Sequence, residues 1–169
     1  MSNKIKVASM QINNGFSGQY YLPYSIGLLC SYLKKHSNKS NDLKFMIPIY
    51  RRGEKSKLVK KIEGVDILLV SLYVWNKNIS LAVAKEIKTI NPDMLVIMGG
   101  PSVPNDASEF MIEHNYIDLC VHQEGEQTIL EIVDTLPNNN YSDIQGLSFR
   151  DDNGIIHNTG IRDRIRDFS

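Results

Sequence analysis

The sequence predicts an α/β fold: a doubly wound parallel sheet of five strands, followed by a small C-terminal β-hairpin. Continuous apolar runs alternate with segments that carry apolar residues at helical spacing, as in folds with helices on both faces of a sheet. The runs 67–72 and 94–98 are apolar throughout, which is typical of strands covered on both faces. Asp151 to Gly154 is a turn sequence between two short apolar segments and predicts the hairpin.

Each strand is expected where an apolar run is bounded by turn residues. Pro48 lies inside the second run, and a proline cannot donate to the ladder of a central strand, so this strand should lie at a sheet edge. With right-handed crossovers, that position favours the flavodoxin-like strand order 2-1-3-4-5. The expected strands are Lys4–Ile12, Phe45–Tyr50, Ile67–Leu72, Met94–Met98 and Leu119–His122, with Ile144–Phe149 and Ile155-Ile156 in the hairpin.

The first helix is expected to begin near Leu22-Pro23, because proline is well tolerated in a first helical turn. Its apolar stripe runs through Leu22, Ile26, Leu29 and Leu33, which should pack on the sheet. The other helices are expected around 56–63, 79–90, 106–114 and 129–136, and Asn13 to Gly18 is expected to be a loop. Residues 1–137 then form the main domain, and residues 138–169 form the hairpin and a linker.

Composition excludes several classes of function. The chain of 169 residues has 19 basic and 19 acidic side chains, so no net charge attracts nucleic acid or an anionic membrane. We expect a cytoplasmic protein, because the sequence has neither a signal peptide nor an apolar run of membrane-spanning length. Cys30 and Cys120 each lie in an apolar stretch, as structural thiols of the core do.

Three loops are expected to meet at the carboxyl edge of the sheet, where such folds bind ligands. They are Ser71 to Asn76, Gly99 to Pro104 and His122 to Glu126. Paired glycines allow backbone to approach a bulky ligand, and the rings of Tyr73 and Trp75 suit a large planar one. Asn76 is expected to cap the following helix while it bonds the ligand.

Each loop also has a plain structural interpretation. Gly99-Gly100 fits a tight turn, and Tyr73 and Trp75 fit packing beneath a loop. Glu124 and Glu126 suit the positive end of the last helix. The combination of the three loops on one edge is what favours a ligand site.

Missing motifs argue against the common occupants of this architecture, although FMN stays possible. A receiver domain needs acidic residues where this chain has Ser71 and Asn13-Asn14, and a flavodoxin needs more hydroxyls than the single serine of Asn13 to Gly18. Neither a dinucleotide fingerprint nor a P-loop is present. No catalytic histidine arrangement is evident either, and the lone His122 at a strand end is typical of a structural, hydrogen-bonded residue.

The loops resemble one known family. The runs 71–76 and 96–101, with Glu124-Gly125-Glu126 and Tyr21-Leu22-Pro23, are similar to the N-terminal cobalamin-binding domain of cobalamin-dependent radical S-adenosylmethionine enzymes. The resemblance covers nearly the whole chain, and the segment Gly146 to Arg150 is similar to the connection toward the radical domain.

The resemblance implies that cobalamin lies on the carboxyl edge, with its nucleotide tail beside the strands. It implies three groups of contacts: the corrin face, the slot for the tail, and the amide arms of the ring. By match to the family, these are Ser71, Tyr73, Trp75 and Asn76 for the corrin, Gly99, Gly100, Pro101 and Val103 for the slot, and Glu124, Gly125 and Glu126 for the arms, with Leu22 and Pro23 closing one side.

Two departures from related families shape the functional hypothesis. Methyl-transfer cobalamin domains supply a cobalt ligand from Asp-x-His-x-x-Gly, but residues 11–24 contain neither histidine nor aspartate, so no protein histidine on cobalt is expected. The chain also lacks Cys-x-x-x-Cys-x-x-Cys, the motif for the iron–sulfur cluster. In addition, Gln123 stands where relatives often have a smaller residue.

The hypothesis is therefore a cobalamin-binding module, inactive alone, of a larger radical S-adenosylmethionine enzyme such as a methyltransferase. In that case the iron–sulfur cluster, S-adenosylmethionine and the catalytic domain belong to the rest of the polypeptide. The alternative is a stand-alone carrier or interaction domain that binds a corrinoid or FMN.

Overall fold

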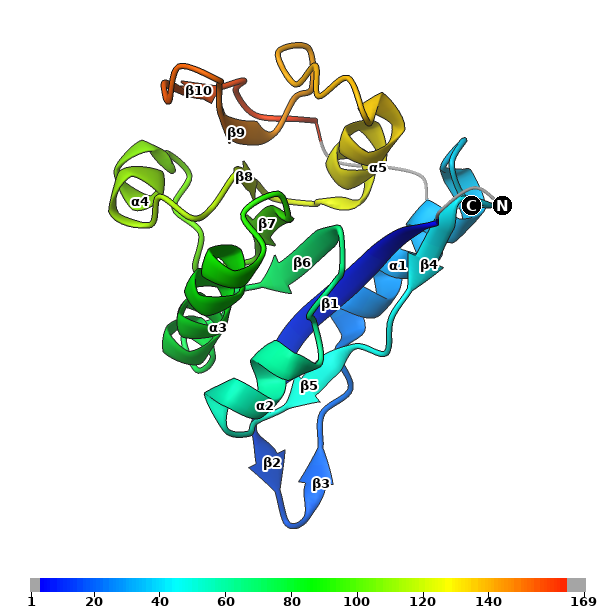
Figure 1. The fold of residues 1–169 in the computed structure, drawn as a ribbon, viewed down its shortest axis with the longest axis vertical. Coiled ribbons are helices and arrows are strands. Elements are labelled where there is room, and N and C mark those ends of the chain that lie inside the picture. The colour runs from blue at the N-terminus through cyan, green and yellow to red at the C-terminus, as the bar shows by residue number, and fades with distance from the viewer. Residues whose placement is uncertain (1–3, 164–169) are drawn as a thin grey trace.

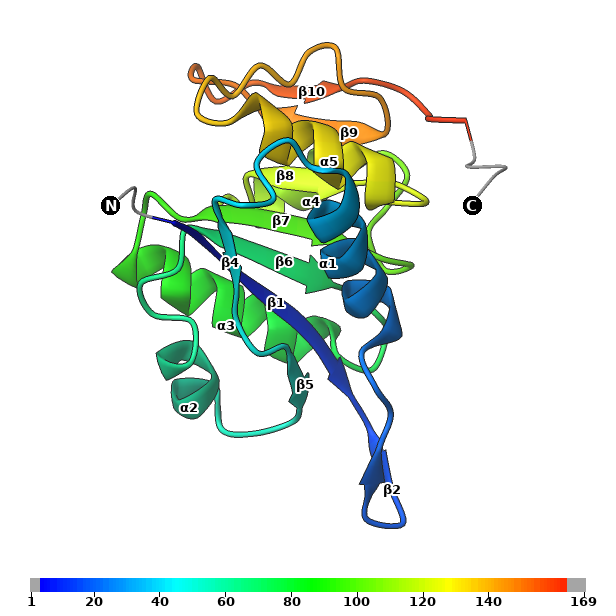
Figure 2. The same ribbon diagram turned by 90° about the vertical axis from the view of Figure 1, so that its right-hand side faces the viewer.

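The computed structural model describes residues 4–163 as one layered α/β unit (Figure 1). A central sheet has α1 and α5 on one face and α2, α3 and α4 on the other (Figures 1 and 2). The helices are α1 (Tyr24–His36), α2 (Lys55–Lys60), α3 (Lys77–Ile90), α4 (Ser108–Glu113) and α5 (Glu126–Thr135). Among residues 4–163, no helix is both long enough and apolar enough to span a membrane.

The main sheet runs in the order β10-β9-β8-β7-β6-β1-β4, and β5 also pairs with β1. The pairs from β4 and β5 through β8 are parallel, whereas β9 and β10 are antiparallel. The strands are β1 (Ile5–Asn13), β4 (Leu43–Phe45), β5 (Ile49–Arg51), β6 (Ile67–Ser71), β7 (Leu95–Gly99), β8 (Leu119–Val121), β9 (Leu147–Arg150) and β10 (Ile156–Asn158). The predicted α/β class is confirmed.

The structure corrects three details of the sequence prediction. The run with Pro48 is two short strands, β4 and β5, with the proline in the break between them. The expected loop after β1 contains a small hairpin, β2 (Gly15–Phe16) and β3 (Gln19–Tyr20), that projects from the domain (Figure 2). The C-terminal hairpin is not separate from the sheet, because β9 pairs with β8 and extends it.

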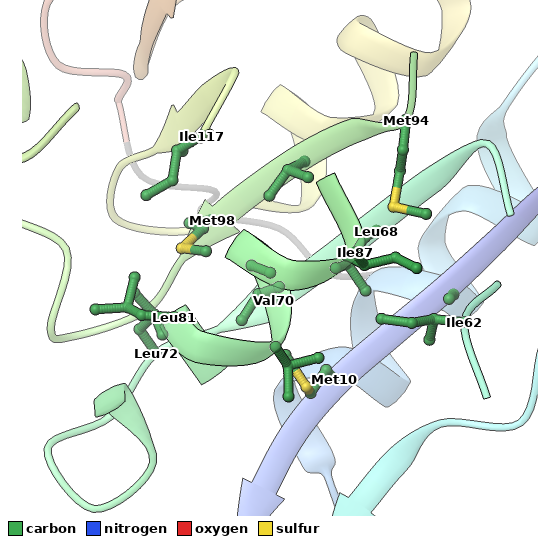
Figure 3. Packing of buried hydrophobic residues seen from close by; sticks show 14 of the residues in the cluster. Met10, Ile62, Leu68, Val70, Leu72, Leu81, Ile87, Met94, Met98 and Ile117 are labelled. Carbon is green, nitrogen blue, oxygen red and sulfur yellow. The ribbon is translucent and has the colours of Figure 1, made fainter. Parts of the chain in front are cut away.

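Two apolar clusters hold the layers together. One lies between the sheet and α2, α3 and α4, where Met10, Val70 and Met98 from three adjacent strands meet Ile87 of α3 (Figure 3). The other lies between the sheet and α1 and α5, and includes Leu69, Ile97 and Ile129. Alternation along the strands sends odd-numbered residues of β6 and β7 to this second face.

Candidate functional site

A cavity of about 280 Å³ opens at the carboxyl edge of the sheet, between α1 and α5; we call it the slot. It lies over β6, β7 and β8, whose parallel register sets Ser71 beside Gly99 at its wall. Helix α1 supplies Tyr24, Ser25, Ile26, Leu28 and Leu29, the sheet Leu69, Val70, Ser71, Ile97, Gly99 and Val121, helix α5 Glu126 and Ile129, and the loops Tyr73, Gly100, Pro101, Gln123, Glu124 and Gly125.

Glycines keep this slot open. Gly99 follows Ile97 on the face toward α1 and α5, so any side chain there would enter the slot. A Cβ on Gly125 would lie 3.2 Å from Cγ1 of Val121, which also lines the slot. The glycines therefore leave space in the slot, so that a bulky group can approach the backbone closely.

Gly100 has a different role, because it allows the turn that ends β7. Its φ is +99°, and a Cβ at this position would lie 2.6 Å from the carbonyl oxygen of Leu72. The turn is held by Leu72 N–H donating to Gly99 O at 2.7 Å and by Val103 N–H donating to Gly100 O at 3.0 Å. Glycine at 100 is thus required by the fold of the loop itself.

The loop after β6 carries an aromatic pair. The rings of Tyr73 and Trp75 stack with centroids 4.6 Å apart and an interplanar angle of 16°. The hydroxyls of Tyr73 and Ser25 share a hydrogen bond of 2.9 Å, and Arg52 donates to the carbonyl of Trp75 at 2.5 Å. Trp75 remains 46% exposed, so the pair presents a broad ring surface at the edge.

Asn76 is the internal brace of that loop. Its Nδ2 donates to the carbonyls of Ile12 and Ser71, each at 3.1 Å, and its Oδ1 accepts from the N–H of Tyr73 at 2.9 Å. The side chain is fully buried. The expected side-chain cap of α3 is therefore wrong: Asn76 stands at the N-cap position, but its side chain bonds backward into the loop.

A second cavity of about 380 Å³, the side cavity, adjoins Tyr73 on the β1 side. Asn13 shapes it by donating from Nδ2 to the carbonyls of Tyr21 and Leu22, at 3.0 and 3.3 Å. Tyr73 lines both cavities and so separates them. The full lining of the side cavity is Gln11, Asn13, Asn14, Tyr21, Leu22, Tyr73 and Trp75, which includes no histidine.

The third loop supplies the acidic rim of the slot. Glu124 and Gly125 precede α5, and Glu126 lies in its first turn, where a carboxylate is favoured by the helix dipole. Gln123, with φ +55°, also lines the slot mouth. Carboxylate oxygens here can accept hydrogen bonds from amide groups of a ligand.

Most of the predicted site residues are brought to these two cavities. Ser71, Tyr73, Gly99, Gly100, Pro101, Glu124, Gly125 and Glu126 line the slot, and Leu22 and Trp75 line the side cavity. Three lie elsewhere: Val103 packs against the core cluster on the opposite face, Pro23 is the N-cap residue of α1, and Asn76 is buried.

The sequence analysis missed the contribution of α1 to the slot mouth. Tyr24, Ser25 and Leu28 line it, together with Leu29 of the predicted stripe. The signal was present in the helical spacing: Ser25 and Leu29 are four residues apart, so they share a face that borders the buried stripe.

His122 is a structural residue in this geometry. Its Nε2 lies 2.8 Å from the hydroxyl of Ser148 on β9, and it does not line the slot. Burial lowers the pKa of His122, because desolvation disfavours the charged ring. Within residues 4–163, no three histidine, cysteine, aspartate or glutamate side chains are grouped to hold a metal ion.

Comparison with known proteins identifies the family. The family model described as "B12 binding domain" matches residues 11–133. The 2-(S-pantetheinyl)-carbapenam-3-carboxylate methyltransferase of Streptantibioticus cattleyicolor is 32% identical over 138 residues, and the cobalamin-dependent radical SAM methyltransferase TokK of Streptomyces tokunonensis is 31% identical over 138 residues. Each match covers 80% of this chain but only 20% of the relative.

Solved structures share the fold. The cobalamin-dependent S-adenosylmethionine radical enzyme OxsB, with aqua-cobalamin and S-adenosylmethionine bound, superposes with a TM-score of 0.72 at 19% identity, over 95% of this chain and 23% of that one. The radical S-adenosylmethionine methyltransferase TsrM from Kitasatospora setae gives 0.71 at 14% identity, over 98% and 30%.

The slot, its glycine cradle and its amide-accepting rim fit the cofactor that the family binds. The chain therefore belongs to the B12 binding domain family, and the cofactor predicted from its sequence, cobalamin, is confirmed.

Proposed function

We propose that this chain is the cobalamin-binding module of a larger radical S-adenosylmethionine enzyme, such as a methyltransferase. The observation that carries the proposal is the slot between α1 and α5, where Gly99 leaves backbone without a side chain at the end of β7. Both relatives above are named as methyltransferases, TokK also as a cobalamin-dependent radical SAM enzyme, and this chain spans 20% of their length. The chemistry of the whole protein thus belongs largely to the rest of the polypeptide.

Different residues contact different parts of the cofactor in this proposal. The slot receives the nucleotide tail along Ser71, Gly99 and Gly100, while Tyr73 and Trp75 support the corrin from below. Glu124 and Glu126 accept from the amide arms of the ring. Leu22 closes the side cavity. When bound, the cofactor supplies the cobalt chemistry of the parent enzyme.

Asn76, Pro23 and Val103 act indirectly in this proposal. Asn76 fixes the loop that carries Tyr73 and Trp75, and Pro23 starts the helix that forms one wall. Val103 anchors the turn after Gly100 to the core.

The partner of this edge is the remaining part of the same polypeptide. A surface of exposed apolar side chains surrounds the two cavities; we call it the edge patch. Three of its members, Leu22, Tyr24 and Val74, are at least 73% exposed. An apolar patch of this kind marks an interaction site. The edge patch consists of Tyr21, Leu22, Tyr24, Leu28, Val74 and Trp75.

The segment after β10 supports that arrangement. Arg162 holds it against α5, because Nε donates to the Thr128 hydroxyl at 3.1 Å and Nη1 to Glu131 at 3.1 Å. Figure 2 shows this segment running toward the same side as the arrowheads of β6 and β7. We propose that residues 138–169 connect the module, residues 1–137, to the catalytic part.

We also propose a cytoplasmic location. Both cysteines are free thiols, and burial raises the pKa of Cys120 to about 12, which makes this thiol unreactive. Free structural thiols are typical of a reducing compartment.

Titration of the purified chain with hydroxocobalamin tests the proposed function. The expected result is a change in the visible spectrum together with co-elution of cobalamin and protein in size-exclusion chromatography. FMN is the matched comparison, because it is the other ligand compatible with this fold. Retention of FMN without retention of cobalamin would replace this proposal with that of a flavin carrier.

A further inference from the structure

The residues that line the slot change in character from its mouth to its deep end. Strands β6 and β7 run toward the edge, so Leu69 and Ile97 lie deeper than Ser71 and Gly99. Helices α1 and α5 begin at the edge, so the backbone of Leu29 and Ile129 lies deeper than that of Ser25 and Gly125. Their side chains reach back toward the mouth, because Cδ2 of Leu29 and Cδ1 of Ile129 would each lie 3.7 Å from a Cβ on Gly125. The deep end, which we call the floor, consists of Leu29, Leu69, Ile97 and Ile129.

The polar side chains of the slot all lie near its mouth. Ser25 is in the first turn of α1, Ser71 is the last residue of β6, and Gln123, Glu124 and Glu126 surround the start of α5. No polar side chain among the described residues that line the slot lies at the level of the floor.

Two polar side chains near the floor, Tyr32 and Ser9, do not line the slot. Tyr32, one turn after Leu29 on α1, donates its hydroxyl to Gln127 of α5 at 3.0 Å. Ser9, the β1 partner of Leu69 in the ladder, does not line the slot. The side chains that a ligand group meets at the floor are therefore all hydrocarbon.

We propose that the floor selects the lower base of the corrinoid: an alkylated benzimidazole is accepted, and a purine is rejected. The inference rests on the proposed function, because it assumes that the nucleotide tail enters the slot. The far end of a dimethylbenzimidazole carries two methyl groups, which pack against Leu69 and Ile97. A purine has ring nitrogens and an exocyclic amine there, and these would lose their hydrogen bonds to water without finding partners.

The test compares three corrinoids on the purified chain: cobalamin, the analogue with adenine as lower base, and cobinamide, which lacks the lower base. We expect cobalamin to bind at least about tenfold more tightly than the adenine analogue, a ratio equivalent to about 1.4 kcal/mol. Cobinamide should bind more weakly than cobalamin, because it leaves the slot empty.

The outcomes separate this inference from the proposed function. Equal affinity for cobalamin and the adenine analogue, or tighter binding of the analogue, would overturn the selectivity and leave cobalamin binding intact. Cobinamide binding as tightly as cobalamin would show that the tail does not use the slot, and would also overturn it. Failure of cobalamin itself to bind would refute the proposed function.

A pair of matched variants locates the selectivity. Ile97→Thr places a hydroxyl on the floor. It should reduce the ratio of the affinity for cobalamin to the affinity for the adenine analogue. Ile67→Thr makes the same change on the same face of the sheet, at an equally buried position outside the slot, and should leave the ratio unchanged. The comparison of the three corrinoids on the unmodified chain tests the inference even if a variant fails to fold.

Discussion

The hydroxyls of Tyr73 and Ser25 lie 2.9 Å apart and join the loop after β6 to the first turn of α1. This bond closes the wall between the slot and the side cavity, because Tyr73 lines both. The aromatic pair of Tyr73 and Trp75 is thus joined to α1, which also lines the slot. This hydrogen bond could not be predicted from the sequence, since the two residues are 48 positions apart.

Removing the hydrogen bond between Tyr73 and Ser25 should lower the stability of the domain, while the aromatic ring at position 73 is kept. Tyr73→Phe and Ser25→Ala are each expected to cost about 1 kcal/mol of unfolding free energy, a common value for one hydrogen bond. The double variant should cost little more than either single one, because both lose the same interaction. Urea denaturation of the four proteins measures this. Strictly additive losses would mean that the two hydroxyls do not interact.

Gly99 and Gly27 offer a matched test of the slot. Gly99→Ala adds a methyl group to the slot wall, and overfilling a packed site costs roughly 1–3 kcal/mol, or about 5- to 150-fold in cobalamin affinity. Gly27→Ala adds the same group on α1, where a Cβ has no neighbour within 4 Å, and should leave affinity unchanged. Spectroscopic titration gives both values. Equal affinity of the two variants would argue against occupation of the slot.

Asn76 should be intolerant of a charge although it lines neither cavity. Asn76→Asp replaces an Nδ2 that donates to two carbonyls with a buried carboxylate oxygen facing them. The expected loss is about 3 kcal/mol of unfolding free energy, with weaker cobalamin binding because the aromatic loop is released.

Asn78→Asp is the control for Asn76→Asp. It makes the same change of charge at an exposed position in the first turn of α3, where the helix dipole favours a carboxylate. Its stability should therefore equal or slightly exceed that of the unmodified chain in thermal denaturation. A similar loss in both variants would point to net charge rather than to the loop.

The predictability of this molecule from its sequence depends on the range of each interaction. The apolar runs of β6 and β7 and the stripe of α1 predict their elements, because periodicity and burial are local signals. The pairing of β9 with β8 was missed, because pairing is a long-range choice that a hairpin sequence does not encode.

The site shows the same contrast between what local sequence predicts and what it does not. Loop positions at strand ends predicted nine of the residues that line the two cavities, since parallel strands end at one edge, and the family resemblance added Leu22. The orientation of a side chain within a loop could not be predicted. Asn76 turns inward to three backbone groups, and Val103 packs on the far face, because local hydrogen bonds and core contacts decide these orientations.

His122 should make the domain less stable in mild acid. Burial lowers its pKa below the ordinary value of 6.5, so the unfolded chain takes up a proton more readily than the folded one. Stability is therefore complete above pH 6.5 and falls as the pH decreases below it. His114, whose pKa burial also lowers, contributes in the same direction.

His122→Gln should reduce this dependence, because glutamine keeps a polar group toward Ser148 but does not titrate. The measurement is the melting temperature between pH 7.5 and pH 5.5 for both proteins. An unchanged pH slope in the variant would assign the effect to other groups, His114 first.

The lower face of bound cobalamin should lack a protein histidine. The segment from Gln11 to Tyr24, which includes most of the side cavity, has no histidine. His122, the first residue of the third loop, is bonded to Ser148 and does not line either cavity. We therefore expect the electron paramagnetic resonance spectrum of the cob(II)alamin complex to show no coupling to a histidine nitrogen on cobalt. Uniform ¹⁵N labelling of the protein gives the decisive control: a spectrum that changes with the label would identify a protein nitrogen ligand and contradict this view of the β1 loop.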